Sequence, residues 1–432
     1  MPILKSDDKR KLFSYLKGKG PRANFIHRML AAAAGRETVS VGEEITIPVD
    51  LALGHDGTAD AFLSAWPSGG SVALPARTVF TLDHLLPAPT VPARELHRKL
   101  QEFARQHRIQ LFSRGEGVLH QVVAERFTPS PGWIIAGADG HVATAGAFGA
   151  LAFSVSSEDL VPVLLTGKLT LKVPHVYTVE VTGTLSPPVT ARDLGLMLLG
   201  RLGKGEVKGK AIGLQGKGVW RLTPAGKMSL CNLMGETGAV TGLIIPPDEA
   251  DKATSADLKV AGETLEPMIA CPPSPENVRP LREVVGTPLT QVLVGGCASG
   301  RLEDMQELVK GLAGRSVHSD IILLVVPASQ DVVHQMEKKG LSRALREQGA
   351  LLLPPGCGPC PGKHLGLIAK GDRVLTTTVR NTPGRMGSAE GEIYLASPRA
   401  AGAAAAAGAV SLFMRKPPAS RRGRPASKHI NT

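Results

Sequence analysis

Three cysteines have a spacing that suits the coordination of a metal. Cys357 and Cys360 form a C-x-x-C pair with prolines and glycines on both sides, and Cys297 lies far upstream. A C-x-x-C pair alone occurs in redox dithiols, zinc sites and iron-sulfur sites. Three thiolates leave one corner of a four-coordinate centre open, which is typical of catalytic metal sites. The set therefore favours a metal or cluster centre over a redox dithiol.

Several histidines stand beside carboxylates just after apolar runs that predict strands. Asp83-His84 ends the predicted strand 78–82, and Asp139 with His141 follows the predicted strand 133–137. A carboxylate that orients a histidine is usually structural, but the combination also serves proton transfer. Open α/β sheets place their chemistry at the carboxyl ends of strands, so several such pairs together favour an active site. The candidates of this kind are Asp83, His84, His120, Asp139, His141 and His55.

Two arginines and two further cysteines could have purely structural roles. Arg380 and Arg385 lie on either side of a Pro-Gly turn, so they are either surface charges or a bidentate clamp for a carboxylate. Cys231 and Cys271 stand apart from the other thiols, and we expect them to be buried as small apolar side chains.

The elements that must position these residues alternate between strand-like and helical patterns. Helices are predicted over 24–34, 93–106 and from Leu302 to Leu312, where apolar residues recur at helical spacing. A strand over 291–294 precedes Cys297, which places this thiol at a strand-to-helix junction whose backbone N–H groups favour a thiolate. This alternation predicts an α/β fold.

Changes in the local sequence pattern divide the chain into three α/β domains and a tail. Short β-like runs begin near residue 171, and a proline-rich linker runs from Cys271 to about Pro288. We predict domains over 1–172, 173–285 and 286–414, with the last carrying the metal-site cysteines. Residues 415–432 form a basic tail that we expect to be disordered.

Composition excludes several classes of function. Five cysteines in 432 residues are too few for a secreted disulfide scaffold, so a cytoplasmic location is expected. The N-terminus lacks an apolar signal segment, and no run reaches the roughly 20 apolar residues that span a bilayer, so no membrane partner is expected. The net charge of +12 is partly carried by the tail, and only 4% of residues are aromatic. Nucleic-acid binding is therefore disfavoured.

With these residues assembled, the chain resembles the aconitase superfamily, specifically large subunits of the 3-isopropylmalate dehydratase and homoaconitase type. The resemblance runs in order from about Asn24 to Gly408. The motifs that carry it are Asp83-His84, Gly117 to Val122, Gly137 to Asp139 with His141, Gly146 to Ala150, Lys227-Met228 with Cys231-Asn232, Gly295 to Asp304, Cys357 to Cys360, Arg380-Asn381 with Gly384-Arg385, and Tyr394 to Pro398.

The resemblance implies a 4Fe-4S cluster on Cys297, Cys357 and Cys360, with one iron free to act as a Lewis acid. It implies that His84, oriented by Asp83, protonates the departing hydroxyl of a hydroxy-carboxylic acid. The remaining implied roles are hydrogen bonds to water and substrate from His120, Asp139, His141 and Glu236, contact with the cluster by Asn232, and substrate binding by His55, Arg380 and Arg385.

The resemblance also implies three aconitase-like domains around a central cluster, without the family's swivelling fourth domain. A separate small subunit is then expected to complete the reaction, in a heterodimer or heterotetramer. 3-Isopropylmalate, in leucine biosynthesis, is the leading substrate, and homoaconitase or a related dehydratase is the alternative.

The chain departs from the family pattern beside the expected cluster. It has Gly140 where the family usually has serine, Ala298 and Ser299 where it has threonine and asparagine, and Val379 where it has asparagine. These losses of hydrogen-bonding groups leave open a different substrate, a reduced activity, or a non-catalytic cluster- or zinc-binding paralogue.

Overall fold

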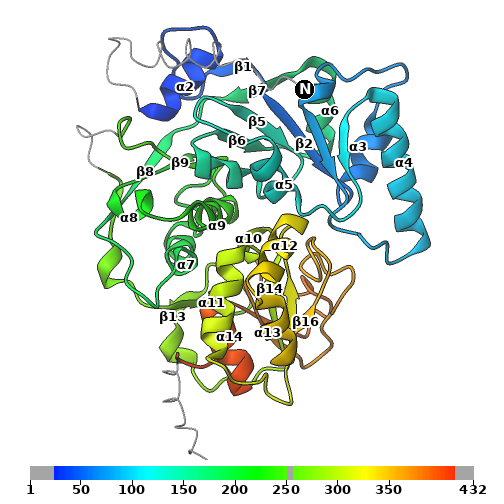
Figure 1. Ribbon diagram of the computed structural model, residues 1–432. Helices are drawn as coiled ribbons and strands as arrows, with labels where there is room; N and C mark the ends of the chain where they lie inside the picture. The colour runs from blue at the N-terminus through cyan, green and yellow to red at the C-terminus, as the bar shows by residue number, and fades with distance from the viewer. Residues whose placement is uncertain (1–23, 251–255, 414–432) are drawn as a thin grey trace, which may run out of the picture.

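The computed structural model describes residues 24–250 and 256–413, which form three larger sheets and one two-stranded sheet with helices packed around them (Figure 1). The predicted basic tail and the first residues of the chain lie outside this range. A helix, α2 (Phe25–Ala33), and a two-stranded antiparallel sheet of β1 (Glu44–Pro48) and β7 (Lys168–Lys172) complete the upper part of the molecule. No helix in the described ranges combines the length and the apolar character that crossing a membrane requires.

The first sheet is parallel and has the strand order β4-β3-β2-β5-β6. Its strands are β2 (Leu51–His55), β3 (Thr78–Thr81), β4 (Gln110–Phe112), β5 (Ile134–Gly137) and β6 (Leu151–Ser154). Alternating side chains of a strand face opposite sides, so Ala52 and Phe80 join one core while Leu53 and Val79 join another. The first core contains α3 (Ala59–Ala65), α4 (Val91–His107) and α6 (Ser157–Thr166), and the second contains α5 (Leu119–Arg126) and the 3-10 helix η2 (Val142–Phe148).

The second sheet is also parallel and has the order β10-β9-β8-β11. Its strands are β8 (Val176–Thr182), β9 (Ala211–Gln215), β10 (Thr241–Ile244) and β11 (Leu258–Ala261), with helices α7 (Ala191–Leu202), α8 (Lys217–Trp220) and α9 (Pro224–Met234). The small residue Gly146 of η2 lies against the backbone of Gly242 in β10 so closely that a Cβ would clash with it. This stretch of small residues therefore packs the first sheet against the second.

The third sheet has seven strands in the order β13-β12-β18-β17-β14-β15-β16. Its strands are β12 (Met268–Ala270), β13 (Val278–Pro280), β14 (Gln291–Gly295), β15 (Ile322–Val326), β16 (Leu351–Leu352), β17 (Arg373–Thr376) and β18 (Glu392–Leu395). β12 and β13 pair antiparallel, and the strands from β18 to β16 are parallel. The helices of this part are α10 (Gly296–Ser299), α11 (Leu302–Leu312), α12 (Gln330–Lys338), α13 (Leu341–Glu347) and α14 (Pro398–Ala407).

The main predicted elements correspond to elements of the structure. The predicted helices 24–34, 93–106 and Leu302 to Leu312 are α2, α4 and α11, and the strand before Cys297 is β14. Residues 268–280 were grouped with the second domain in our predicted bounds, whereas their two strands hydrogen-bond to the third sheet. Residues that precede the end of the proline-rich linker therefore already belong to the third sheet.

Candidate active site

The first sheet delivers three of the predicted polar residues at its carboxyl edge. His55 is the last residue of β2, while Asp83 and Asp139 follow two residues after β3 and β5. These strands are parallel neighbours, so their ends open at the same edge of the sheet. The three side chains are buried, with exposed fractions below a tenth.

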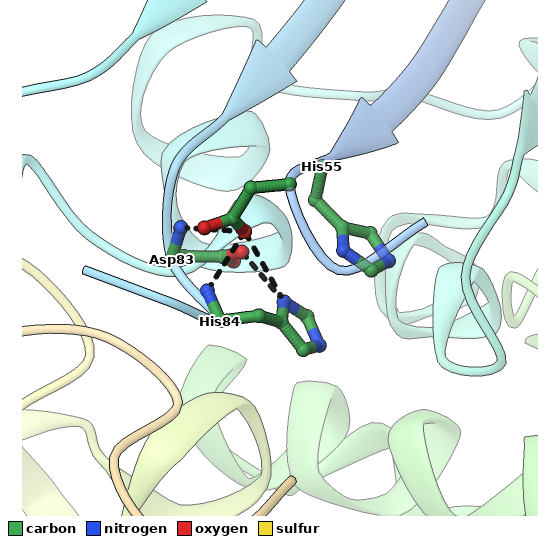
Figure 2. A group of neighbouring side chains, drawn as sticks. His55, Asp83 and His84 are labelled. Carbon is green, nitrogen blue, oxygen red and sulfur yellow. Dashed lines mark hydrogen bonds and ion pairs between the residues drawn. The ribbon is translucent and has the colours of Figure 1, made fainter. Parts of the chain in front are cut away.

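Asp83 and His84 form a close pair in this edge (Figure 2). Oδ1 of Asp83 lies 2.7 Å from Nδ1 of His84, and Oδ2 accepts the backbone N–H of Leu119 at 2.7 Å. Burial alone would lower the pKa of His84, but the charge and hydrogen bond of Asp83, helped by two further carboxylates, raise it to about 9. His84 therefore carries its proton at neutral pH. The ring of His55 stacks on that of His84, with centroids 3.9 Å apart.

Asp139 is a second carboxylate around which histidines gather. Its Oδ2 lies 3.2 Å from Nε2 of His55, and its Oδ1 lies 2.8 Å from Nε2 of His120. The same Oδ1 accepts the backbone N–H of His141 at 2.6 Å. Burial would raise the pKa of Asp139, but the charge of His120 and these hydrogen bonds hold it well below its usual value. Asp139 thus stays ionised and orients three histidines.

Glu236 joins polar residues that follow strands of the first and third sheets. It lies in the turn after α9, where Oε1 is 2.8 Å from Nε2 of His141 and both oxygens accept Nε–H of Arg380, at 2.9 and 2.8 Å. Burial would raise its pKa, but the hydrogen bonds and charges of His141 and Arg380 lower it to about 2. The chain Asp139–His141–Glu236–Arg380 is therefore continuous across all three sheets.

The three predicted metal-site cysteines come together although Cys297 lies in α10 and the Cys357/Cys360 pair lies on a loop much later in the chain. Cys297, Cys357 and Cys360 line one small cavity with Thr378 and Val379. Cys297 is in α10, directly after β14, as predicted. Burial raises the pKa of Cys297, and it raises that of Cys357 well above the usual value.

Polar groups from the other domains surround this thiol cavity. Nδ2 of Asn232 donates to Oγ1 of Thr144 at 2.9 Å and to Sγ of Cys297 at 3.5 Å, and the Asn232 Oδ1 has no partner. Sγ of Cys357 lies 3.9 Å from both ring nitrogens of His84, and Nη2 of Arg385 lies 3.7 Å from Sγ of Cys360. The thiols and the acid pair therefore belong to a single site.

A cavity of about 910 Å³ opens beside the thiols and gives access to the site. The predicted residues that line it are His55, His84, Asp139, His141, Arg380 and Arg385. Asp83, His120 and Glu236 do not line the cavity and hold the lining residues through the contacts above, whereas Asn232 contacts Thr144 and Cys297. Cys231 and Cys271 are buried and lie outside the thiol cavity, as expected of small apolar side chains.

Sequence reasoning missed several residues that position the acid pair. The buried Asp56 accepts backbone N–H groups of Asp83 and His84 at 3.2 and 2.9 Å, and its other oxygen lies 3.0 Å from Nε2 of His97. Nε2 of His364 lies 3.0 Å from the carbonyl oxygen of His84. Asp56 was visible beside His55, but nothing in the pattern of α4 separated His97 from a surface histidine.

Comparison of the sequence with known proteins identifies one family. The model of the aconitase family (aconitate hydratase) matches residues 31–256 and 247–408. The chain belongs to the aconitase family. The "3-isopropylmalate dehydratase large subunit 1" of Methanopyrus kandleri is 39% identical over 89% of this chain and 97% of its own. The "Methanogen homoaconitase large subunit" of Methanocaldococcus jannaschii is 34% identical over 89% of this chain and 98% of its own.

Among solved structures, aconitase X of Thermococcus kodakaraensis, in its holo-form, covers 90% of this chain at a TM-score of 0.49 and 12% identity, with 94% of that chain covered.

The departures from the aconitase-family pattern lie where hydrogen-bonding groups were expected. A Cβ on Gly140 would come within 2.8 Å of Nη2 of Arg380, so the guanidinium occupies the space of a side chain at this position. Ala298 and Val379 are buried in the core beside the second sheet, and both line the thiol cavity. The wall of this cavity is therefore partly apolar.

Proposed function

We propose that this chain is the cluster-bearing large subunit of an iron-sulfur hydro-lyase that isomerises a hydroxy di- or tricarboxylic acid by dehydration and rehydration. The single observation that carries the proposal is that the ring of His84, paired with Asp83, lies 3.9 Å from Sγ of Cys357, one of the three thiols that line a single small cavity. The leading substrate is 3-isopropylmalate, because two relatives with that name are 39% and 37% identical to this chain. Homoaconitase is the alternative, since relatives of nearly the same similarity carry that name.

The thiol cavity fits an iron-sulfur cluster better than a single zinc ion. A tetrahedral zinc site holds sulfur at about 2.3 Å from the metal, so the distances between its ligand atoms are short. Within the described ranges, the groups of three or more ligand atoms that lie within 4.8 Å of one another do not include the cysteine trio. Cys297, Cys357 and Cys360 would hold a 4Fe-4S cluster. When bound, this group supplies an iron without a protein ligand that polarises the substrate hydroxyl.

The side chains of the cavity would supply binding and proton transfer. His84 protonates the departing hydroxyl oxygen, and Asp83 keeps its ring oriented and charged until the proton moves. Arg380 and Arg385 bind substrate carboxylate, because both line the cavity and arginine suits that geometry. His55 faces the substrate from the stacked position on His84. Hydrogen bonds hold the oxygens of the substrate and of the water that leaves and returns. The residues that make these bonds are linked to one another in pairs: His120 with Asp139, and His141 with Glu236.

A small, swivel-domain subunit would complete the enzyme, as a heterodimer or heterotetramer. Relatives called large subunits support this partner. The open cavity of about 910 Å³ leaves ample space above the substrate for residues of another chain. We place the reaction in the cytoplasm, which the five free cysteines favour.

A non-catalytic cluster- or zinc-binding paralogue is the second candidate function. The observation that favours it is the apolar wall formed by Ala298 and Val379 beside the thiols. Fewer hydrogen bonds to a cluster lower its retention by about 10- to 100-fold in comparable metal sites.

Anaerobic reconstitution with iron and sulfide tests both candidates. The loaded protein, mixed with a small subunit, should convert 3-isopropylmalate to an alkene that absorbs in the ultraviolet. Conversion of homoaconitase substrates alone would favour the alternative. A brown protein without turnover on any hydroxy acid would leave the binding paralogue, and a colourless zinc-loaded protein would reject the cluster.

A further inference from the structure

The cavity of the candidate active site has walls of unlike chemistry. Three cations of the third domain line it: Lys363, Arg380 and Arg385. The first domain contributes the histidines and carboxylates described above and also residues of α3 and α4. The carboxylates of a substrate suit the arginines. A substituent that is neither hydroxyl nor carboxylate must therefore lie against another part of the wall.

An apolar strip of this wall begins next to the acid pair. Leu85 follows His84 directly, and Ala93 and Leu96 lie on one face of α4, since residues three apart in a helix are neighbours. Leu85, Ala93 and Leu96 all line the cavity. Both leucines are half-buried, and Leu96 packs against the core of the first sheet. An apolar group that covered the remaining surface of these leucines would remove that surface from water, which is favourable.

The carboxylate of Asp56 fixes this strip relative to His84. Its Oδ2 accepts the backbone N–H of Leu85 at 2.9 Å and lies 3.0 Å from Nε2 of His97, the residue after Leu96. Its Oδ1 accepts the backbone N–H of His84 at 2.9 Å. One carboxylate therefore holds both the turn of His84 and the part of α4 that carries Leu96.

Two further carboxylates border the part of the cavity between α3 and α4. Asp60 of α3 and Glu95 of α4 line it and are exposed. The two helices lie side by side (Figure 1) and pack through the rings of Phe62 and Phe103, whose centroids are 5.5 Å apart. Lys99 also lines this part, one turn after Glu95 on α4. The charges that the two helices present to the cavity are thus mostly negative and would repel an additional carboxylate.

We propose that α4 sets the substrate selectivity of this site: Leu85 and Leu96 bind an uncharged branched substituent, while Glu95 and Asp60 exclude a carboxylate from the same place. This inference rests on the proposed function, whose two leading substrates differ in this substituent. 3-Isopropylmalate carries an alkyl group where the homoaconitase acids carry a chain that ends in a third carboxylate. The large subunit thereby selects the substrate in addition to holding its carboxylates.

Two unreactive acids test the selectivity without turnover. Isopropylsuccinate and tricarballylate share the succinate core and differ in one substituent, which is an isopropyl group in the first acid and a carboxymethyl group in the second. Isothermal titration calorimetry without oxygen measures the dissociation constant of each acid. The sample is the reconstituted chain together with a small subunit, at low and at high ionic strength.

Matched controls accompany the two variants. Leu96→Ala shortens the apolar strip, and Leu367→Ala is its control, since Leu367 is 48% exposed and does not line the cavity. Glu95→Lys reverses one charge of the cavity wall. Glu102→Lys makes the same change on α4 at an exposed position that does not line the cavity.

The parent should bind isopropylsuccinate at least about tenfold more tightly than tricarballylate. Leu96→Ala should weaken the binding of isopropylsuccinate about tenfold and change that of tricarballylate by less than about twofold. Glu95→Lys should tighten the binding of tricarballylate about tenfold at low ionic strength, and the gain should shrink as salt screens the charge. Both controls should bind the two acids as the parent does.

The inference is overturned if the parent binds tricarballylate as tightly as isopropylsuccinate, or binds neither acid. It is also overturned if Leu96→Ala weakens both acids equally, or if Glu95→Lys has no more effect than Glu102→Lys. Glu95 is exposed, so this second variant keeps the test open even where Leu96→Ala does not fold. The proposed function fails separately, when the unmodified protein takes up no cluster or converts no hydroxy acid.

Discussion

Nε2 of His97 lies 3.0 Å from Oδ2 of Asp56, and this buried pair ties α4 to the turn that carries Asp83 and His84. Asp56 also accepts the backbone N–H groups of Asp83, His84 and Leu85. The Asp83-His84 pair is therefore held in place by the carboxylate of Asp56, which lines the cavity and whose oxygens bind groups of the protein. Asp56 is a positioning residue whose removal should be felt in both stability and turnover.

Asp56→Ala should lower the free energy of unfolding by about 3 to 5 kcal/mol, because His97 and three backbone N–H groups lose their acceptor. Chemical denaturation of the empty protein measures this change. Asp60→Ala is the control, since Asp60 is exposed on the next turn. An Asp56→Ala protein as stable as the control would show that the pair contributes nothing.

Replacing single cysteines should separate the metal ligands from the other thiols. Cys297→Ser, Cys357→Ser and Cys360→Ser should each abolish or strongly reduce the brown colour after reconstitution, because the three thiols line one cavity. Cys271→Ala should load iron and sulfide like the parent, as Cys271 lies outside that cavity. Full iron content in Cys360→Ser would refute the ligand assignment.

Asn232→Ala should shorten the lifetime of the bound cluster by about tenfold or more. The variant removes the Nδ2 donor that joins Thr144 to Sγ of Cys297. Absorbance in the visible range, followed after addition of a chelator, measures the lifetime. Asn277→Ala serves as control, because its amide donates to the carbonyl oxygen of Pro272 and neither residue lines the thiol cavity. Equal lifetimes in the two variants would contradict the role of Asn232.

Glu236 should contribute stability that depends on pH. Its pKa falls from 4.5 to about 2 in the folded chain, so the contribution is complete above pH 4.5 and is lost as the pH falls toward 2. A shift of this size corresponds to at most about 3 kcal/mol.

Denaturation of the empty protein between pH 3 and pH 7 checks this contribution. Glu236→Gln should flatten the acid side of the stability profile relative to the exposed-residue control Glu102→Gln. Parallel profiles for the two variants would disprove the assignment.

Gly140→Ser should displace the guanidinium of Arg380, because a Cβ at this position would lie 2.8 Å from Nη2. In the reconstituted enzyme we expect KM to rise more than kcat falls, since a substrate-binding group moves. The double variant with Arg380→Lys should lose little beyond Arg380→Lys alone. Strictly additive losses would mean that the two positions do not interact.

Local patterns in the sequence predicted most of the polar site and the elements that carry it. Strand-like runs ending in Asp83 or Asp139 were recognisable because apolar periodicity and a polar terminus are both local signals. The pairing of β12 with β18 was not, because strand partners are chosen by contacts between distant residues. Arg192 looked like an ordinary helix charge, although it is buried and donates to the carbonyl oxygen of the distant Thr378.

The dispersal of the site along the chain sets the order in which the protein must mature. His84 and Cys357 meet in space although 273 residues separate them, and Arg385 comes later still. A ribosome has released nearly the whole polypeptide before these groups are able to converge. If these thiols hold the proposed cluster, its iron and sulfide can be inserted only after most of the chain has been synthesised.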